Sequence, residues 1–237
     1  MAAADEWTAR KPLVGGHVRL GPLGVEHVAG LLEVGLQPDI WRWSVAVIRT
    51  HEDMHAYVEA ALAARSAGNE LPFATIEATT GRVVGSTRFM SMVPVHRRLE
   101  IGHTWLAPAW QRTAINTEAK LMMLGHAFDA LHCVRVEFKT DSLNTTSRRA
   151  LLGIGATEEG TLRNHMITDG AVGVTRSTTA SSTTSGRPSG HDCRRGWRHI
   201  PDGGRPATVR LKARRPAPLP SFSPRCGATA RTSRPVR

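Results

Sequence analysis

The sequence predicts one α/β domain followed by a basic tail, and two observations support this. Segments with strand or helix periodicity follow one another in the order β-α-α-β-β-β-α-β-α-β as far as residue 167. Farther along, residues 171–237 carry 14 Lys and Arg against 2 Asp and Glu, whereas residues 1–170 are nearly neutral. A chain of 237 residues is long enough to bury a sizeable core in its first part.

The first three elements are predicted to be a strand and two helices. Residues 17–23 alternate and end in Gly-Pro, as a short strand does, and residues 24–36 space Val and Leu at helical intervals. Thr50 precedes an amphipathic segment over residues 51–69, and Asp53 follows it three positions later as in a capping box.

The middle of the chain predicts an antiparallel meander. Residues 72–93 contain two β-runs joined by a turn at 79–82, and a third run over 96–108 stops at Pro108. A helix (115–131), a buried strand (133–140), a second helix (144–154) and a strand (158–167) are expected to follow.

Several classes of protein are excluded or disfavoured. Cys133, Cys193 and Cys226 lack metal-ligand spacing and leave an odd count, and Cys133 is expected in the core. The HEDMH stretch at 51–55 matches a zinc-protease pattern, but it falls on the solvated first turn of a capped helix, so we expect no metal. No apolar run approaches a membrane span, and we expect a cytoplasmic protein without a membrane partner.

The segment 105–131 is the most informative for function. A strand ends, a polar turn follows, and a helix begins near Ile115. Free amides and the positive dipole end at such a helix start suit a phosphate or pyrophosphate, and Arg112 adds a charge beside them. An ordinary capped helix is the alternative, because every helix has such a start.

Two longer stretches carry a resemblance to a known family. They are RLEIGHTWLAPAWQRTAINTEAKLMMLGHAF and RVEFKTDSLNTTSRRALLGIGATEEGTLRNHMI. In order and spacing they resemble the GNAT acyltransferases, in the branch related to ribosomal-protein alanine and serine acetyltransferases. The resemblance implies the GNAT acyl-CoA N-acyltransferase fold (α+β), with a mixed, mostly antiparallel sheet flanked by helices, over residues 13–170. It also implies acetyl-CoA as cosubstrate and an amine acceptor, either a protein N-terminus or a small molecule, and a homodimer stays open.

The resemblance also implies site residues. The family holds the coenzyme A pyrophosphate in a Gln/Arg-x-x-Gly-x-Gly/Ala loop, which here corresponds to Gln111, Arg112, Thr113, Ala114, Ile115, Asn116 and Thr117. Its glycines are absent, which bears on a loop that needs positive φ or close backbone approach. Asn144 is expected to contact the pantetheine arm, although it is equally an N-cap, and Ser147 to face the thioester sulfur.

Glu100 corresponds to a carboxylate that faces the acceptor amine in this branch, on the opposite side of its strand from Leu99 and Ile101. An amine acceptor arrives protonated, so we expect Glu100 to take up a proton, directly or through water, with His103 as a weaker candidate. A backbone amide near Leu106 is expected to stabilise the thioester oxygen, and Ser147 or water to protonate the thiolate. The alternative is that Glu100 is an ordinary strand glutamate whose carboxylate is exposed to solvent.

The last part of the chain departs from the family. Family members end in a hairpin strand with a Trp-Pro pair, whereas residues 175–190 read TRSTTASSTTSGRPSG, so we expect the final strand to be missing. A shift of one base permits HSVYYGVVDDEWPAVR over the same codons. We therefore predict that the reading frame changes near 169–174, that residues 171–237 are a disordered tail translated out of frame, and that stability and activity are reduced.

Two other functions stay open at this point. The chain could be a catalytically inactive coenzyme A-binding remnant. Alternatively, the basic tail could be a genuine arm that associates with nucleic acid or ribosomes through its charge. The nearly neutral domain itself offers no basic face for nucleic acid, so that partner is disfavoured.

Overall fold

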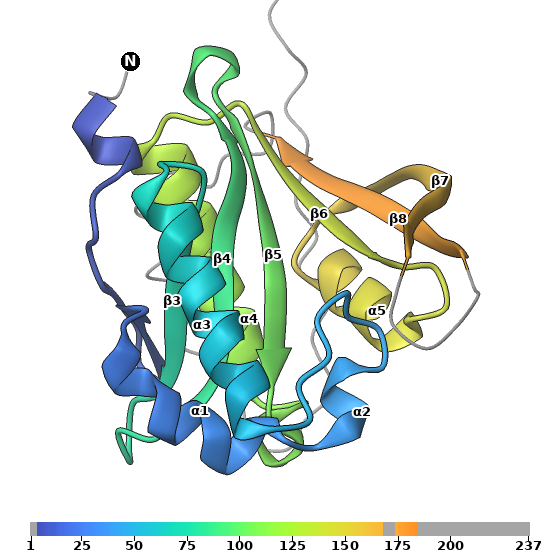
Figure 1. The fold of residues 1–237 in the computed structure, drawn as a ribbon. Coiled ribbons are helices and arrows are strands. Elements are labelled where there is room, and N and C mark those ends of the chain that lie inside the picture. The colour runs from blue at the N-terminus through green and yellow to red at the C-terminus, as the bar shows by residue number, and fades with distance from the viewer. Residues whose placement is uncertain (1–3, 168–173, 184–237) are drawn as a thin grey trace, which may run out of the picture. The chain divides into compact units, whose positions relative to one another are not determined.

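The computed structural model describes residues 4–167 and 174–183, which belong to one compact unit, Met1–Thr184 (Figure 1). The strands form one sheet in the order β1-β2-β3-β4-β5-β6-β8-β7. Their bounds are β1 Leu13–Val14, β2 Val18–Pro22, β3 Leu71–Glu77, β4 Val83–Val93, β5 Arg98–Leu106, β6 Arg135–Asp141, β7 Thr157–Ile167 and β8 Val174–Thr183. Among these strands, β5 and β6 are the one parallel pair.

Helices cover both faces of the sheet (Figure 1). They are α1 Val28–Gly35, α2 Pro38–Trp41, α3 His51–Ser66, α4 Ala114–Gly125 and α5 Thr145–Gly153. Short 3₁₀ turns lie at Ala4–Trp7, Val25–His27, Pro94–His96 and Pro108–Trp110, and a π turn at His126–Ala130 extends α4. The predicted elements up to residue 167 are therefore confirmed, whereas β1, α2 and the first 3₁₀ turn were not predicted.

The start of α3 shows why the sequence forms a helix there. The backbone N–H of Asp53 donates to Thr50 Oγ1 at 3.1 Å, and Thr50 N–H donates to Asp53 Oδ2 at 2.9 Å. This capping box satisfies amides that have no carbonyl one turn earlier. His51 and His55 of the zinc-protease-like pattern are exposed and Met54 is buried, so the predicted polar turn is confirmed.

The core has two layers, one on each face of the sheet. In the first layer α4 packs Ile115 and Met123 against apolar residues of β2 to β6, and Cys133 lies in this layer as predicted. In the second layer α1 and α3 pack against β3 and the ring of Trp105, which contacts Trp41 with ring centroids 5.1 Å apart.

A β-bulge in β5 decides which residues reach each layer. Between the pairs Trp105–Ser86 and Gly102–Arg88 the strand β5 has one residue more than β4, and His103 has a φ of 47°. Because an inserted residue reverses the alternation, Leu106 returns to the α4 layer and Trp105 turns to the α3 layer. Simple alternation from Leu99 would place these two side chains the other way round.

The expected loss of the final strand is wrong for residues 174–183. Their backbone forms β8, which pairs antiparallel with β6 on one side and with β7 on the other. Backbone hydrogen bonds need no apolar side chains, and four threonines favour extended structure, so the ladder forms without the expected alternation. Strand β7 is consequently the edge of the sheet, and its Leu162 and Met166 are 43% and 39% exposed.

The predicted boundary at residue 170 falls among residues 168–173, which lie outside the described residues. Residues 184–237 also lie outside them. The division into a domain and a disordered tail, and the change of reading frame, therefore stay predictions.

Candidate active site

The sheet opens between its two parallel strands. Strand β5 pairs with β6 only at Arg98, Leu99 and Glu100, and beyond these residues the two strands diverge (Figure 1). A cleft of about 210 Å³ lies at this opening, and β5 residues from Glu100 to Trp105 and β6 residues from Phe138 to Asp141 line it. Because no backbone ladder closes the sheet here, a ligand can reach residues of both faces through one opening.

Each face of the sheet contributes its own wall to the cleft. The wall on the side of α1 to α3 contains Ile40, Trp41, Trp43, Ser44, Val45, Tyr57 and Met90. The wall on the side of α4 and α5 contains Lys120, Asn144, Ser147 and Leu151. The first wall is mostly aromatic and aliphatic, whereas the second contains a lysine from the second turn of α4 and the polar start of α5.

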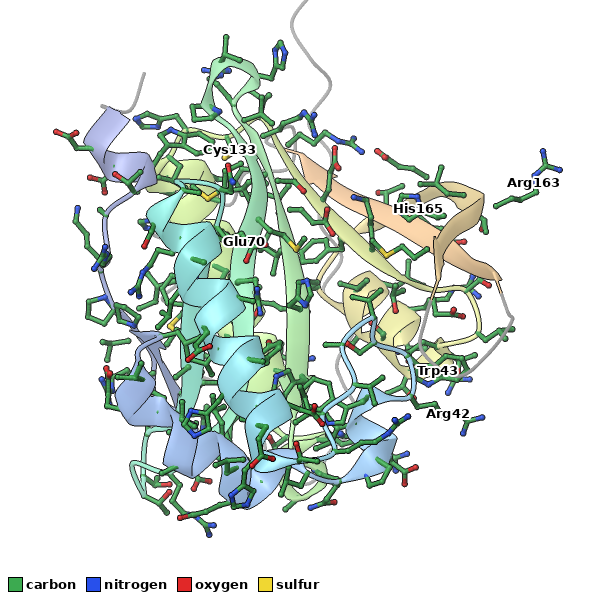
Figure 2. All side chains as sticks on the ribbon, in the orientation of Figure 1. Arg42, Trp43, Glu70, Cys133, Arg163 and His165 are labelled. Atoms are coloured by element: carbon green, nitrogen blue, oxygen red, sulfur yellow. The ribbon has the colours of Figure 1, made fainter. Side chains whose placement is uncertain are left out.

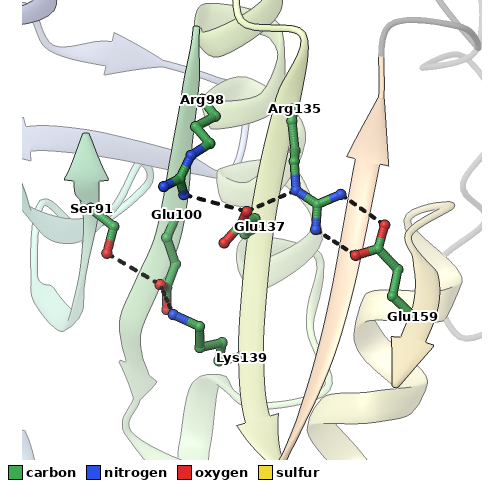
Figure 3. A network of polar contacts seen from close by, with 7 residues as sticks. All are labelled: Ser91, Arg98, Glu100, Arg135, Glu137, Lys139 and Glu159. Atoms are coloured by element: carbon green, nitrogen blue, oxygen red, sulfur yellow. Dashed lines mark hydrogen bonds and ion pairs between the residues drawn. The ribbon is translucent and has the colours of Figure 1, made fainter. Parts of the chain in front are cut away.

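Glu100 lies in the cleft and is held by two neighbours (Figure 3). Its side chain is 6% exposed, and its Oε2 accepts from Lys139 Nζ at 2.7 Å and from Ser91 Oγ at 3.4 Å. Leu99 and Ile101 point into the α4 layer, so Glu100 faces the opposite side as predicted. The alternative of a solvated strand glutamate is wrong, because this carboxylate is buried and ion-paired.

A second set of charges lies beside this pair and stays out of the cleft lining (Figure 3). Glu137, the register partner of Glu100, pairs with Arg98 at 3.5 Å and with Arg135 at 2.7 Å. Arg135 also pairs with Glu159 of β7. These pairs tie β5, β6 and β7 together at the point where the parallel ladder ends.

The backbone amide of Leu106 points into the opening. Ala107 N–H donates to Val84 O at 2.9 Å, and successive residues of a strand alternate in direction, so Leu106 N–H faces away from β4. The Leu106 carbonyl faces the same way and accepts from Gln111 Nε2 at 2.9 Å. The Leu106 amide is therefore directed away from β4, and its predicted role towards the thioester oxygen stays a prediction.

The predicted pyrophosphate loop leads into α4. Thr113 is the N-cap, with its Oγ1 accepting from Ile115 N–H at 3.4 Å and donating to Trp110 O at 2.7 Å. Ala114 and Asn116 lie in the first turn, where amides have no intrahelical acceptor, whereas Thr117 is the first residue whose amide has one, the carbonyl of the N-cap Thr113. Ile115 is buried, so only its backbone can take part.

The loop reaches α4 without the glycines that the family has at these positions. Positions 114 and 116, where the family has small residues, are helical here, and the left-handed conformation falls instead on exposed Arg112, with a φ of 61°. A non-glycine residue there costs about 1 kcal/mol. Exposed Gln111 braces the loop on β5 through its bond to Leu106.

Asn144 and Ser147 meet at the start of α5. The Asn144 Oδ1 accepts from Ser147 N–H at 3.0 Å, which confirms the N-cap interpretation, and both residues line the cleft. Because the cap uses the oxygen of the Asn144 amide, its NH₂ group is the part that can donate to a ligand. The Ser147 side chain is half-buried.

Two other titratable groups are poor candidates for chemistry. Burial, together with the charge of Arg88, lowers the pKa of His103 to about 4, so this side chain is neutral at pH 7 and only weakly basic. Burial raises the pKa of the Cys133 thiol to about 12, so this residue stays a protonated core thiol. Within residues 4–167 and 174–183, no cluster of three or more His, Cys, Asp or Glu side chains could hold a metal ion.

The comparisons with known proteins agree with this geometry. A family model described as an acetyltransferase (GNAT) domain matches residues 17–157.

The chain belongs to the GNAT acetyltransferase family.

Solved GNAT structures cover most of the domain. A GCN5-related N-acetyltransferase from Brucella melitensis is 27% identical, with a TM-score of 0.72 over 80% of this chain and 86% of that chain. Mycobacterium smegmatis RimJ, solved in complex with CoA-disulfide, is 25% identical, with a TM-score of 0.64 over 75% of this chain and 88% of that chain.

A curated GNAT relative matches over a shorter segment. The uncharacterised N-acetyltransferase YoaA of Bacillus subtilis is 31% identical over 91 residues, which are 38% of this chain. The match spans 51% of that relative, about half of its length.

Several residues of this GNAT site were not predicted from the sequence. Lys120 and Lys139 line the cleft, as do the aromatic residues Trp41, Trp43 and Tyr57. Lys120 lies four positions after Asn116 and three before buried Met123, so its place on the inner face of α4 could have been found from helical spacing. The aromatic wall could not have been found from the sequence, because a bulge and a segment without regular periodicity bring its residues together.

The aromatic wall ends in a cationic surface group. The guanidinium of Arg42 lies 4.9 Å from the centroid of the Trp43 ring, on the segment that follows α2 (Figure 2).

In the part of the chain that the structure describes, no helix is long and apolar enough to cross a membrane. The cytoplasmic location stays a prediction.

Proposed function

We propose that this chain transfers an acetyl group from acetyl-CoA to a primary amine by direct attack on the thioester. The observation that carries the proposal is the cleft between β5 and β6, which has a buried carboxylate on one wall and, on the other, a buried lysine of α4 and the polar start of α5. The coenzyme lies on the side of α4 and α5, and the amine enters from the side of α1 to α3.

Residues at the starts of α4 and α5 and at the end of β5 suit the parts of coenzyme A in order. The amides of Ala114 and Asn116 and the charge of Arg112 suit the pyrophosphate. The Asn144 amide suits the pantetheine arm, and the Leu106 amide suits the thioester oxygen, on which negative charge develops during attack. The match to RimJ, which was solved with CoA-disulfide, supports the same ligand.

Glu100 is proposed to prepare the acceptor. A carboxylate beside aromatic rings attracts an ammonium group, and it can take a proton from the amine, directly or through water, as nitrogen attacks the thioester carbon. The C–S bond then breaks, and coenzyme A leaves as a thiolate that takes up a proton from Ser147 or water. Lys139 orients the carboxylate through its 2.7 Å contact.

The acceptor is a protein N-terminus or a small amine. Resemblance to the ribosomal-protein alanine and serine acetyltransferases favours the protein N-terminus, and the apolar wall around Trp41 and Trp43 suits a small first side chain next to the amine.

The first experiment is thermal unfolding of the purified full chain with and without acetyl-CoA. A ligand of the native state at 100 times its Kd stabilises by about 2.7 kcal/mol, so the midpoint should rise. An unchanged midpoint in a folded sample would contradict the binding assignment. Stabilisation by acetyl-CoA without turnover of any amine would indicate an inactive coenzyme A-binding remnant. Detectable but slow turnover would fit the predicted reduction of activity.

Glu100→Gln tests the proposed base. We expect kcat/KM for the amine to fall by about 100-fold or more, because a positioned base contributes about 10²–10⁴. Glu137→Gln is the matched control, since it removes the same charge from the register partner outside the cleft. Equal effects of the two substitutions would remove Glu100 from this role.

The alternative of a nucleic-acid-binding arm depends on residues outside the described ones. Deletion of residues 184–237 tests this alternative, because RNA binding that survives the deletion cannot come from that segment.

A further inference from the structure

A lysine that none of the assignments above uses lies on the second wall of the cleft. Lys120, in the second turn of α4, is 7% exposed, and its Nζ donates to Asn116 Oδ1 at 2.8 Å. Among the described residues no carboxylate pairs with it, because Glu118 on the same helix binds backbone amides and Glu100 binds Lys139. A buried ammonium group without a counter-ion is costly, so its retention needs a reason.

Lys120 lines both cavities at this end of β5. One is the cleft, and the other is a small cavity of about 10 Å³ that Thr87, Thr104 and Leu106 also line. Thr104 lines both cavities as well. Lys120 therefore contacts the cleft beside the stretch of β5 whose Leu106 amide faces the opening.

The two walls place an acid and a base on opposite sides of the opening. Glu100 faces the wall from which the amine enters, whereas Lys120 and Ser147 belong to the wall on which coenzyme A lies. When nitrogen attacks from the first side, sulfur departs towards the second. An ammonium group is a stronger acid than a serine hydroxyl, so of these two groups Lys120 is the better proton donor for sulfur.

We propose that Lys120 is a catalytic residue, the general acid that protonates the departing coenzyme A thiolate. The proposal rests on the acetyl-transfer function proposed above. As the C–S bond breaks, an Nζ–H proton passes to sulfur and gives the free thiol and a neutral lysine. Glu100 takes a proton from the attacking amine, and both groups return to their starting states by exchange with solvent.

The acidity of Lys120 suits this task. Burial lowers its pKa to about 8, so it is mostly protonated at pH 7 and close in acidity to a thiol, whose ordinary pKa is about 8.5. A donor matched to its acceptor transfers a proton with little change in free energy. The other titratable side chains that line the cleft are Tyr57, Glu100, His103, Lys139 and Asp141.

The test compares three substitutions by their pH–rate profiles with acetyl-CoA and a saturating amine. Lys120→Met keeps the length of the side chain without its charge, and Lys120→Arg keeps the charge on a group that does not give up its proton. Lys11→Met is the control, because Lys11 is exposed and pairs with Glu6 away from the cleft.

For the wild-type chain we expect kcat to fall as the pH rises above about 8, where Lys120 loses its proton. Lys120→Met and Lys120→Arg should both lower kcat by about 10- to 100-fold, the lower part of the range for acid catalysis because a thiolate leaves readily. Both should lose the fall above pH 8, which a merely structural role would not change. Stabilisation by acetyl-CoA should persist in Lys120→Met, and Lys11→Met should match the wild type.

Four results overturn the proposal, and they differ from one another. Full activity of Lys120→Arg would mean that only the charge matters, and near-normal kcat in Lys120→Met would mean that neither charge nor proton does. A wild-type chain without acetyl-CoA-dependent turnover would instead overturn the proposed function itself, and with it this role. A Lys120→Met variant with a lower thermal midpoint and a normal pH limb would reveal a packing role.

Discussion

Glu118 anchors α4 to the start of the sheet, and its removal should destabilise the domain strongly. This carboxylate is 3% exposed, and it accepts from the amides of Gly16 at 2.7 Å, His17 at 2.7 Å and Val18 at 2.9 Å. Two of the donors lie in the turn between β1 and β2 and the third is the first residue of β2, about 100 residues away in the sequence. One side chain therefore joins the start of α4 to the edge of the sheet.

The expected magnitude follows from these three bonds. Hydrogen bonds to a charged group each contribute about 1.5–3 kcal/mol, and a buried donor left without a partner costs about 1–3 kcal/mol. Water can enter the space left by Glu118→Ala and satisfy part of this loss, so we expect about 4 kcal/mol. Glu118→Gln should cost about 2 kcal/mol, because one amide oxygen still accepts while the NH₂ group faces a donor.

Urea unfolding followed by circular dichroism measures the change directly. A loss of about 4 kcal/mol corresponds to a thermal midpoint about 8–16 °C lower for a domain of this size. Glu33→Ala is the matched control, because Glu33 is exposed and its contact with Arg82 is 3.6 Å, and it should change stability by about 0.5 kcal/mol or less. A Glu118→Ala variant within about 1 kcal/mol of the wild type would refute the reasoning.

Two further predictions concern the bulged strand and its neighbour. A Cβ on Gly85 would lie 2.1 Å from the backbone oxygen of Trp105, so Gly85→Ala should lower the unfolding free energy by about 3 kcal/mol or prevent folding. Gly125→Ala, where nothing lies within 4 Å, should instead stabilise by about 0.5–1 kcal/mol, and thermal midpoints compare the two. His103 has a lower pKa in the folded chain than its ordinary 6.5, so stability should fall by about 3 kcal/mol as the pH drops from 6.5 through 4. The variant His103→Asn should reduce this fall, and asparagine tolerates the left-handed conformation of this position. Urea titrations at pH 6.5 and at pH 4 measure the fall in unfolding free energy. An unchanged fall would assign the pH dependence to another group.

Much of the fold followed from local patterns in the sequence. The capping box at Thr50 and the N-cap at Asn144 are short-range interactions, so residue types and spacing alone were sufficient to predict them. The meander over residues 72–106 followed from alternation and turn residues. The order of Glu100, the α4 loop and Asn144 along the chain also indicated the family.

The final strand shows where such patterns fail. Residues 174–183 lack the apolar alternation of a central strand, yet their backbone pairs with both β6 and β7. A sequence pattern reports side chains, whereas a ladder is made of backbone groups whose partners come from elsewhere in the chain. The neighbours of a strand are therefore what its own residues cannot reveal.

The sequence by itself determined most of the elements up to residue 167, their order and the family of this protein, because these follow from local residue patterns. Only the tertiary structure decided how the site is assembled. The site depends on the bulge at His103, which decides that Trp105 faces the α3 layer and Leu106 the α4 layer. It also depends on the divergence of β5 from β6 after Glu100. It also required the folding of α4 against the sheet, which buries Lys120 at the cleft without a counter-ion among the described residues. These features depend on which strands meet and where their pairing stops, and that is settled by contacts between residues far apart in the chain.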